Sequence, residues 1–206
     1  TAETVSSRPQ IQPLTRASVN ECAIRRSSVA SMPPHRNRQA AARDWERLDA
    51  IVATLRRRGH RIRLVRVGSL LREQTRRRMS ELGVSDVIEL PFIDRGVLRA
   101  IYERCNLLAL TSDREGYGLP VLEAFAAGKP VVASDIPALR ESSGGLATLV
   151  PADSLDEWVS AIERVLRSDD PGGPLAAERR RHAAARTWDH HVQGLLTVYE
   201  EILVAQ

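Results

Sequence analysis

The sequence predicts an α/β domain in which helices cover both faces of a parallel sheet. Helical and strand patterns alternate along most of the chain, as they do in folds built from strand–helix–strand units. The segment 106–111 is apolar on both sides, as expected of a strand that helices cover on both faces. A glycine-rich loop at 112–119 follows it and precedes a helical pattern, which is where ligands bind in open sheets of this class.

Each predicted element follows from a hydrophobic period that is bounded by turn residues. The first helix extends from about Ala40 to Gly59, with Leu48, Val52 and Leu55 on its apolar face. Strands are expected at 61–67, 87–90, 106–111, 130–133 and 147–150, after a weaker strand at 23–29. Helices are expected between them at 70–82, 97–104, from 120 onward and around 136–142.

The last part of the chain is predicted to be helical. Ser154 and Glu157 form a Ser-x-x-Glu capping box in front of an apolar stripe. The turn 169–173 separates this helix from an arginine- and alanine-rich one, and a final helix carries apolar residues from Val192 to Ile202. We therefore expect one domain over 23–206, preceded by a poorly ordered leader or remnant at 1–22.

The composition is that of a globular protein kept in a reducing compartment. Of the 206 residues, 43% are hydrophobic and 27% charged, and no apolar run approaches the roughly 18 residues of a membrane span. The cysteines, Cys22 and Cys105, have no disulfide or zinc spacing. The chain begins without a secretory signal or a methionine, which leaves room for a missing upstream segment. We expect a cytoplasmic protein.

The basic residues are almost all arginines. The formal charge is +4, only Lys129 is a lysine, and arginine runs occur at 56–58, 76–78 and 179–181. Separate runs of this kind are typical of solvated helix surface, and no nucleic-acid-binding motif accompanies them. We expect no nucleic-acid partner, although a binder of nucleic acid or membrane surfaces stays open as one hypothesis.

The loop after the strand 106–111 has the residues best suited to chemistry. Glu115 and Glu123 are eight positions apart, one in the loop and the other near the start of the following helix. Ionised carboxylates are pure acceptors, which suits neighbouring hydroxyls of a sugar or ribose ring. Gly116 and Gly118 permit close backbone approach, and Pro120 suits a first helical position whose free amides bind anionic oxygens. Each feature alone also fits a tight turn or a glutamate that complements the helix dipole.

The combined motif is more specific. Glu-Gly-Tyr-Gly-Leu-Pro-x-x-Glu-Ala at 115–124, with Gly-Lys-Pro-Val-Val at 128–132, Asp135 and Leu-Arg-Glu at 139–141, resembles the donor-binding half of retaining GT-B glycosyltransferases of family 4. That family's signature is a Glu-x7-Glu pair around a Gly-Phe/Tyr-Gly-Leu-Pro turn. The resemblance covers roughly 29–203 and implies a Rossmann-like parallel sheet with helices on both faces, one half of a GT-B fold.

The resemblance also implies a role for each residue of the motif. Glu115 would hold hydroxyls of the donor sugar, and Glu123 would hold the ribose. A backbone cradle for the sugar and the diphosphate would come from Gly116, Tyr117, Gly118 and Leu119.

A basic loop near the start of the domain supplies an arginine and a lysine to the diphosphate in this family. Here Arg36 stands where lysine is usual and would neutralise phosphate. His35 stands in place of the arginine, and Ala30 in place of a glycine. A solvated basic turn is the alternative for this loop.

The chemistry implied is sugar transfer with retention from a nucleotide-sugar substrate. In the family's usual mechanism a phosphate oxygen of the donor accepts the proton of the acceptor, so that no protein nucleophile is required. Positive groups and helix-end amides stabilise the leaving diphosphate. No cofactor and no metal are expected, because the chain has no Asp-x-Asp motif. Asp135 is expected to cap the short helix that follows it.

Two hypotheses about the whole chain follow from the resemblance. The first is an enzyme domain that binds an activated sugar and transfers it. The alternative is a truncated, non-catalytic nucleotide-sugar-binding module, because GT-B enzymes resemble two facing domains and this chain has room for one. The facing amino-terminal domain would be a partner that carries most of the acceptor site and any peripheral contact with a membrane. The sequence does not specify the base, the sugar or the acceptor.

Overall fold

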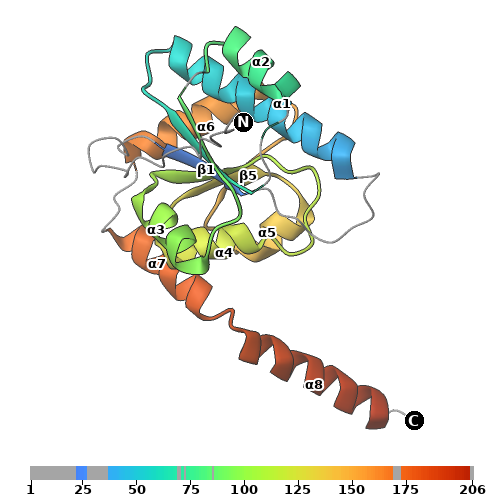
Figure 1. Cartoon of the computed structure of the whole chain (residues 1–206). Coiled ribbons are helices and arrows are strands. Elements are labelled where there is room, and N and C mark those ends of the chain that lie inside the picture. Colours follow the sequence, from blue (N-terminus) through green and yellow to red (C-terminus); the bar gives the residue numbers. More distant parts are fainter. Residues whose placement is uncertain are drawn as a thin grey trace, which may run out of the picture.

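The computed structural model describes residues 22–26, 37–68, 71, 73–84, 86–168 and 173–204, with side chains from residue 46 onward. Within these residues one parallel sheet is formed (Figure 1) by β1 (Cys22–Arg26), β2 (Arg63–Val67), β3 (Val87–Leu90), β4 (Leu107–Leu110), β5 (Val131–Ser134) and β6 (Thr148–Val150). The strand order is β3-β2-β1-β4-β5-β6, and every neighbouring pair is parallel. This is the order of the Rossmann fold, which confirms the predicted class.

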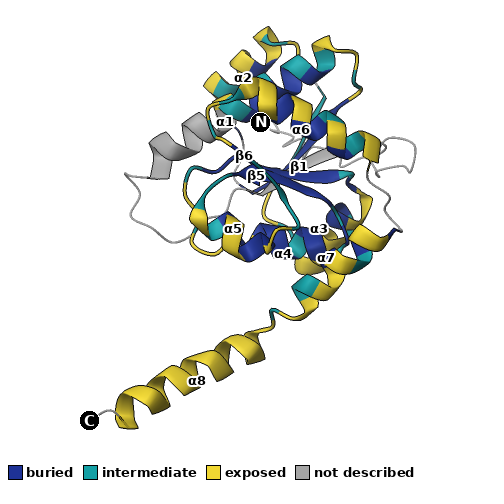
Figure 2. Cartoon of the chain, turned by 180° about the vertical axis from the view of Figure 1, so that it is seen from behind, coloured by how far each residue is buried: buried dark blue, intermediate teal, exposed yellow. Residues whose placement is uncertain are grey.

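Helices cover both faces of the sheet (Figures 1 and 2). One face is covered by α1 (Asn37–Arg57), α2 (Glu73–Glu81) and α6 (Leu155–Ser168). The other face is covered by α3 (Arg95–Arg104), α4 (Leu119–Ala126), α5 (Pro137–Ser143) and α7 (Pro174–Ala184). Between consecutive strands a helix returns the chain to the opposite edge of the sheet, which is what parallel pairing requires.

The sheet separates two hydrophobic cores, and β4 contributes to both. Leu107 and Ala109 belong to the core beneath α1 and α6, whereas Leu108 and Leu110 belong to the core that contains α3, α4 and α5. The exposed fraction of all four is 1% or less. The prediction that this strand is buried on both sides is confirmed. Full burial of a leucine side chain stabilises the fold by about 1.5–3 kcal/mol.

Some element boundaries differ from the predicted ones by a few residues. Strand β2 begins at Arg63 instead of residue 61, because the amide of Ile62 donates to the carbonyl of His60 in a turn. Strand β1 begins at Cys22, the last residue of the expected leader, and residues 1–21 lie outside the described residues. None of the helices in the described ranges is long and apolar enough to cross a membrane.

The last helix, α8 (Trp188–Val204), extends away from the body and has no buried residue (Figure 2). Its large apolar side chains are all at least 45% exposed: Trp188, Val192, Leu195, Leu196, Val198, Tyr199, Ile202, Leu203 and Val204. The body therefore forms its two cores without a contribution from α8.

Candidate functional site

The loop that joins β4 to α4, residues 111–118, lies at the carboxyl edge of the sheet next to its centre. Strand β1 pairs with β2 on one side and with β4 on the other, so the order of the strands reverses between β1 and β4. In open α/β sheets, ligands bind outside the carboxyl ends of the strands at such a switch point. Arg36 follows β1 in the sequence and lies outside the described residues.

The two glycines of this loop differ in what the fold demands of them. Gly118 precedes α4 with φ 78° and ψ 37°, a left-handed conformation. A Cβ on Gly118 would lie 2.7 Å from Ser142 Oγ and 2.8 Å from Leu139 Cδ2, so the packing of α5 also excludes a side chain. A Cβ on Gly116 would meet no atom within 4 Å. The fold therefore requires Gly118, whereas the open space beside Gly116 allows a ligand to approach the backbone.

The first turn of α4 offers fewer amides than a regular helix start. Pro120 is the second residue of α4, one position later than predicted, and it has no N–H. The amide of Val121 donates to the carbonyl of Gly118 at 2.9 Å. Binding of an anion at this end therefore depends on the amides of Gly118 and Leu119. The side chains of Leu119 and of the neighbouring Tyr117 are 48% and 43% exposed.

A buried tyrosine holds the second glutamate of the predicted pair. Glu123 lies in the second turn of α4 and is half-buried. Tyr102 of α3 is only 2% exposed, and its hydroxyl donates to Oε2 of Glu123 at 3.0 Å. Because the ring of Tyr102 is packed in the core, this bond orients the carboxylate of Glu123. Glu115 is half-buried in the loop, four residues before α4 begins.

A sequence model described as glycosyl transferases group 1 matches residues 42–168, more than half of the chain. The chain belongs to the group 1 glycosyltransferases. The matched region of this group 1 glycosyltransferase domain includes the loop 111–118, both glutamates and Tyr102. Among the residues that the structure describes, no group of three or more His, Cys, Asp or Glu side chains is arranged to hold a metal ion.

Curated relatives match this group 1 glycosyltransferase domain over a stretch similar in length to the one that the family model matches. The D-inositol 3-phosphate glycosyltransferase of Salinispora arenicola is 37% identical over 131 residues, which make up 61% of this chain and 29% of the relative. The enzyme of the same name from Gordonia bronchialis is 32% identical over 126 residues, 60% of this chain and 28% of the relative. The chain thus matches less than a third of the length of these relatives.

Solved structures share the fold of the group 1 glycosyltransferase domain. Sucrose-phosphate synthase from Thermosynechococcus elongatus has a TM-score of 0.70 at 23% identity, over 93% of this chain and 49% of that chain. Anabaena HepE in complex with UDP-glucose has a TM-score of 0.67 at 20% identity, over 92% of this chain and 50% of that chain. The chain spans about half the length of these structures. With the family match, this confirms the predicted resemblance to one half of a GT-B glycosyltransferase.

Local sequence patterns did not predict two side-chain contacts near the loop 111–118. Tyr102 falls within the helix predicted at 97–104, and its partner Glu123 is 21 residues away. Arg47 of α1 donates from Nη1 to the carbonyl oxygen of Thr111 at 2.7 Å and to Oδ1 of Asp113 at 2.9 Å. No local motif marks either contact, because each depends on where a helix packs against the sheet.

Asp135, which follows β5 in the group 1 glycosyltransferase domain, does not cap α5, so that prediction is wrong. The N-cap of α5 is Ile136, whose apolar side chain makes no capping hydrogen bond. Both carboxylate oxygens of Asp135 instead accept from Arg140, from Nε at 2.5 Å and from Nη2 at 2.8 Å. The hydrogen bond from Arg140 lowers the pKa of Asp135 below its usual value. The amide of Asp135 donates to the carbonyl of Val150 in β6, so the chain is still extended at Asp135 and the helix begins one residue too late for Asp135 to be its cap.

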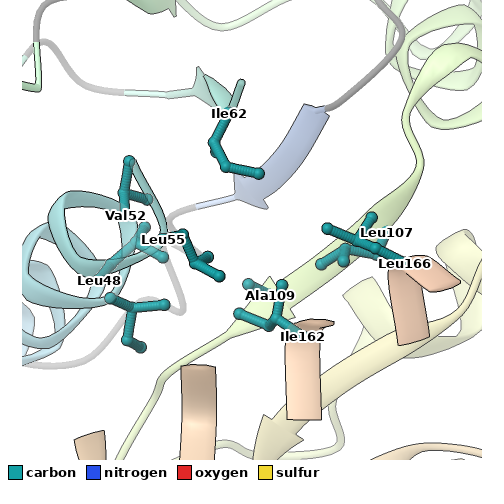
Figure 3. Close-up of a pocket in the computed structure, with 9 residues that line it drawn as sticks. Leu48, Val52, Leu55, Ile62, Leu107, Ala109, Ile162 and Leu166 are labelled. Atoms are coloured by element: carbon teal, nitrogen blue, oxygen red, sulfur yellow. The ribbon is translucent and has the colours of Figure 1, made fainter. Parts of the chain in front are cut away.

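An aliphatic space elsewhere in the group 1 glycosyltransferase domain lacks the features of a substrate site (Figure 3). It lies between α1, α6 and the sheet, and its lining consists of Leu48, Ile51, Val52, Leu55, Ile62, Leu107, Ala109, Ile162 and Leu166. Ile62 directly precedes β2 and Leu107 begins β4, so this space lies toward the amino edge of the sheet. Substrate pockets combine apolar walls with a few converging polar groups, and this lining has none.

Proposed function

We propose that this chain binds a nucleotide-activated sugar at the loop 111–118 and takes part in the retaining transfer of that sugar to an acceptor. The observation that carries the proposal is the hydrogen bond between Tyr102 and Glu123. A buried phenol orients one carboxylate in the second turn of α4, and the loop before α4 has a second carboxylate, Glu115, at the switch point of the sheet. Two such acceptors suit the paired hydroxyls of a ribose and a hexose.

Glu123 is proposed to bind the ribose. A carboxylate accepts at about four lone-pair positions, so the bond from Tyr102 orients Glu123 without using up its capacity as an acceptor. A prepositioned carboxylate binds diols better than a mobile one, because less side-chain freedom is lost on binding.

Glu115 is proposed to bind hydroxyls of the sugar. The backbone of Gly116, Tyr117, Gly118 and Leu119 is proposed to contact the sugar and the diphosphate. The open space beside Gly116 supports this arrangement, because a ligand needs close access to the main chain there.

The charge that develops on the leaving diphosphate requires positive partners. We propose that Arg36 and the amides of Gly118 and Leu119 supply them. The bond from the anomeric carbon to the diphosphate breaks while the acceptor oxygen bonds to the same face of that carbon. A phosphate oxygen of the donor takes the proton of the acceptor. Retention therefore needs no protein nucleophile.

Calorimetric titration with UDP-glucose, GDP-glucose and ADP-glucose tests the proposal. UDP-glucose is the first probe because HepE, a structural relative, was solved with it. We expect Glu123→Ala to weaken binding about tenfold or more, the value of a hydrogen bond to a charged group. Glu103→Ala is the matched control, because Glu103 is an exposed glutamate of α3 that pairs with Arg99. Failure of all three nucleotide sugars to bind would remove the donor site.

Turnover separates the enzyme from the non-catalytic module. The chain spans about half the length of the solved relatives, so we expect the chain alone to bind the donor without transferring the sugar. Steady release of UDP from UDP-glucose by the chain alone would contradict this expectation.

The arginine runs do not favour the nucleic-acid hypothesis. The three arginines of the run 76–78 each form an ion pair with a glutamate. Paired surface charges leave little net field for a polyanion. Salt-sensitive binding to DNA or RNA that Glu115→Ala does not change would favour that hypothesis instead.

A further inference from the structure

One arginine connects α1 to the loop that carries Glu115. Arg47 lies next to the fully buried Leu48, and only 14% of its side chain is exposed. Its Nη1 donates to the carbonyl oxygen of Thr111 at 2.7 Å and to Oδ1 of Asp113 at 2.9 Å. Thr111 is the first residue after β4 and is itself fully buried. The guanidinium therefore sits where the loop leaves the sheet.

The two bonds constrain the direction of the loop. One nitrogen holds a main-chain oxygen at Thr111 and a carboxylate oxygen at Asp113, so the backbone around Ser112 between them is held as well. The bond to Asp113 is charge-assisted, and such bonds are about twice as strong as neutral ones. Glu115 follows Asp113 by two residues, so its position depends on this anchor.

We propose that Arg47 is a positioning residue for Glu115, which it serves by holding residues 111–113 so that the carboxylate of Glu115 reaches the hydroxyls of the donor sugar. The inference rests on the proposed function of Glu115. Glu123 is oriented separately, by Tyr102 from α3 on the other face of the sheet. Loss of Arg47 therefore weakens binding of the sugar and leaves binding of the nucleotide unchanged.

The same helix provides a matched control at the opposite edge of the sheet. Arg56 donates from Nε and Nη2 to the carbonyl of Ile62 at 3.1 and 2.8 Å, and from Nη1 to the carbonyl of Gly83 at 3.1 Å. Ile62 directly precedes β2, so these bonds join α1 to loops at the amino edge. Arg56→Ala removes a comparable set of bonds without touching the donor loop.

Calorimetry with UDP-glucose and with UDP, on the same variants, tests the inference. We expect Arg47→Ala to weaken binding of UDP-glucose about tenfold and binding of UDP less than about twofold, since one charged hydrogen-bonding anchor is lost. Arg47→Lys recovers part of the loss, because an ammonium group can donate to both oxygens. Arg56→Ala lowers the melting temperature and leaves the ratio of the two affinities unchanged.

Hydrogen exchange reports on the anchor without any ligand. We expect Arg47→Ala to speed the exchange of amides in 112–115, next to the anchor, relative to the rest of the chain, because local opening sets their exchange rate. Arg56→Ala should leave the exchange of this segment unchanged. Equal exchange of 112–115 in the wild type and in Arg47→Ala contradicts the anchor.

The outcomes separate this inference from the proposed function. If Arg47→Ala folds and loses both affinities equally, or neither, the positioning role is overturned and the donor site stands. If the wild type binds none of UDP-glucose, GDP-glucose and ADP-glucose, the proposed function fails and the positioning role fails with it. If Arg47→Ala does not fold, Asp113→Asn decides, and an unchanged ratio of the affinities for UDP-glucose and UDP then overturns the inference.

Discussion

Replacing Tyr102 with phenylalanine removes one hydroxyl and keeps the buried ring, so it isolates the hydrogen bond to Glu123. The bond is 3.0 Å long and the tyrosine is 2% exposed, whereas Glu123 is half-buried. Immobilising a long side chain at a binding site costs about 0.5–1.5 kcal/mol. If the hydroxyl already immobilises Glu123 before UDP binds, its removal in Tyr102→Phe weakens UDP binding by roughly two- to tenfold.

The assay is a calorimetric titration with UDP, paired with urea unfolding to separate binding from stability. We expect the free energy of unfolding to fall by about 1 kcal/mol, the net value of one hydrogen bond. Tyr199→Phe is the control, because Tyr199 is exposed on α8. If Tyr102→Phe binds UDP as tightly as the wild type while Glu123→Ala does not, the hydroxyl does not orient Glu123 and the reasoning is refuted.

Three further predictions test other parts of the structure. Gly118→Ala should lower the free energy of unfolding by about 1–3 kcal/mol, because Gly118 has a left-handed backbone and packs against α5. Gly116→Ala should leave the free energy of unfolding unchanged and weaken donor binding. Equal stability of the two variants in urea would contradict this expectation. Deleting residues 188–206 should leave the melting temperature of the body within about a degree or two by calorimetry, because α8 buries nothing against it, and a large drop would show otherwise. Burial raises the pKa of the Cys105 thiol to about 12, so the reactive thiolate is scarce at pH 8. Mass spectrometry after iodoacetamide treatment should therefore find Cys105 alkylated in urea but not in the folded chain.

Local patterns predicted the elements that form the site with good accuracy. The continuous apolar run around Leu108 and Ala109 predicted a strand buried on both sides, because successive residues of a strand face opposite sides of the sheet. The turn chemistry around Gly118 and Pro120 located the start of α4 to within one residue. The cap predicted at Asp135 was wrong, because the backbone of Asp135 still pairs with β6 and the helix begins after Ile136; the carboxylate of Asp135 accepts from Arg140 instead.

The amino-acid sequence alone was sufficient for the α/β class, the family resemblance and the presence of two glutamates on one loop and helix. The order of the strands, which sets the loop 111–118 beside β1, came only from the tertiary structure. The partners of Glu123 and Asp113 also came only from it, since Tyr102 and Arg47 lie 21 and 66 residues away. Hydrophobic periodicity records which face of an element is buried. It does not record which distant polar group the packed helices bring against that face, because that depends on how all the layers fit together.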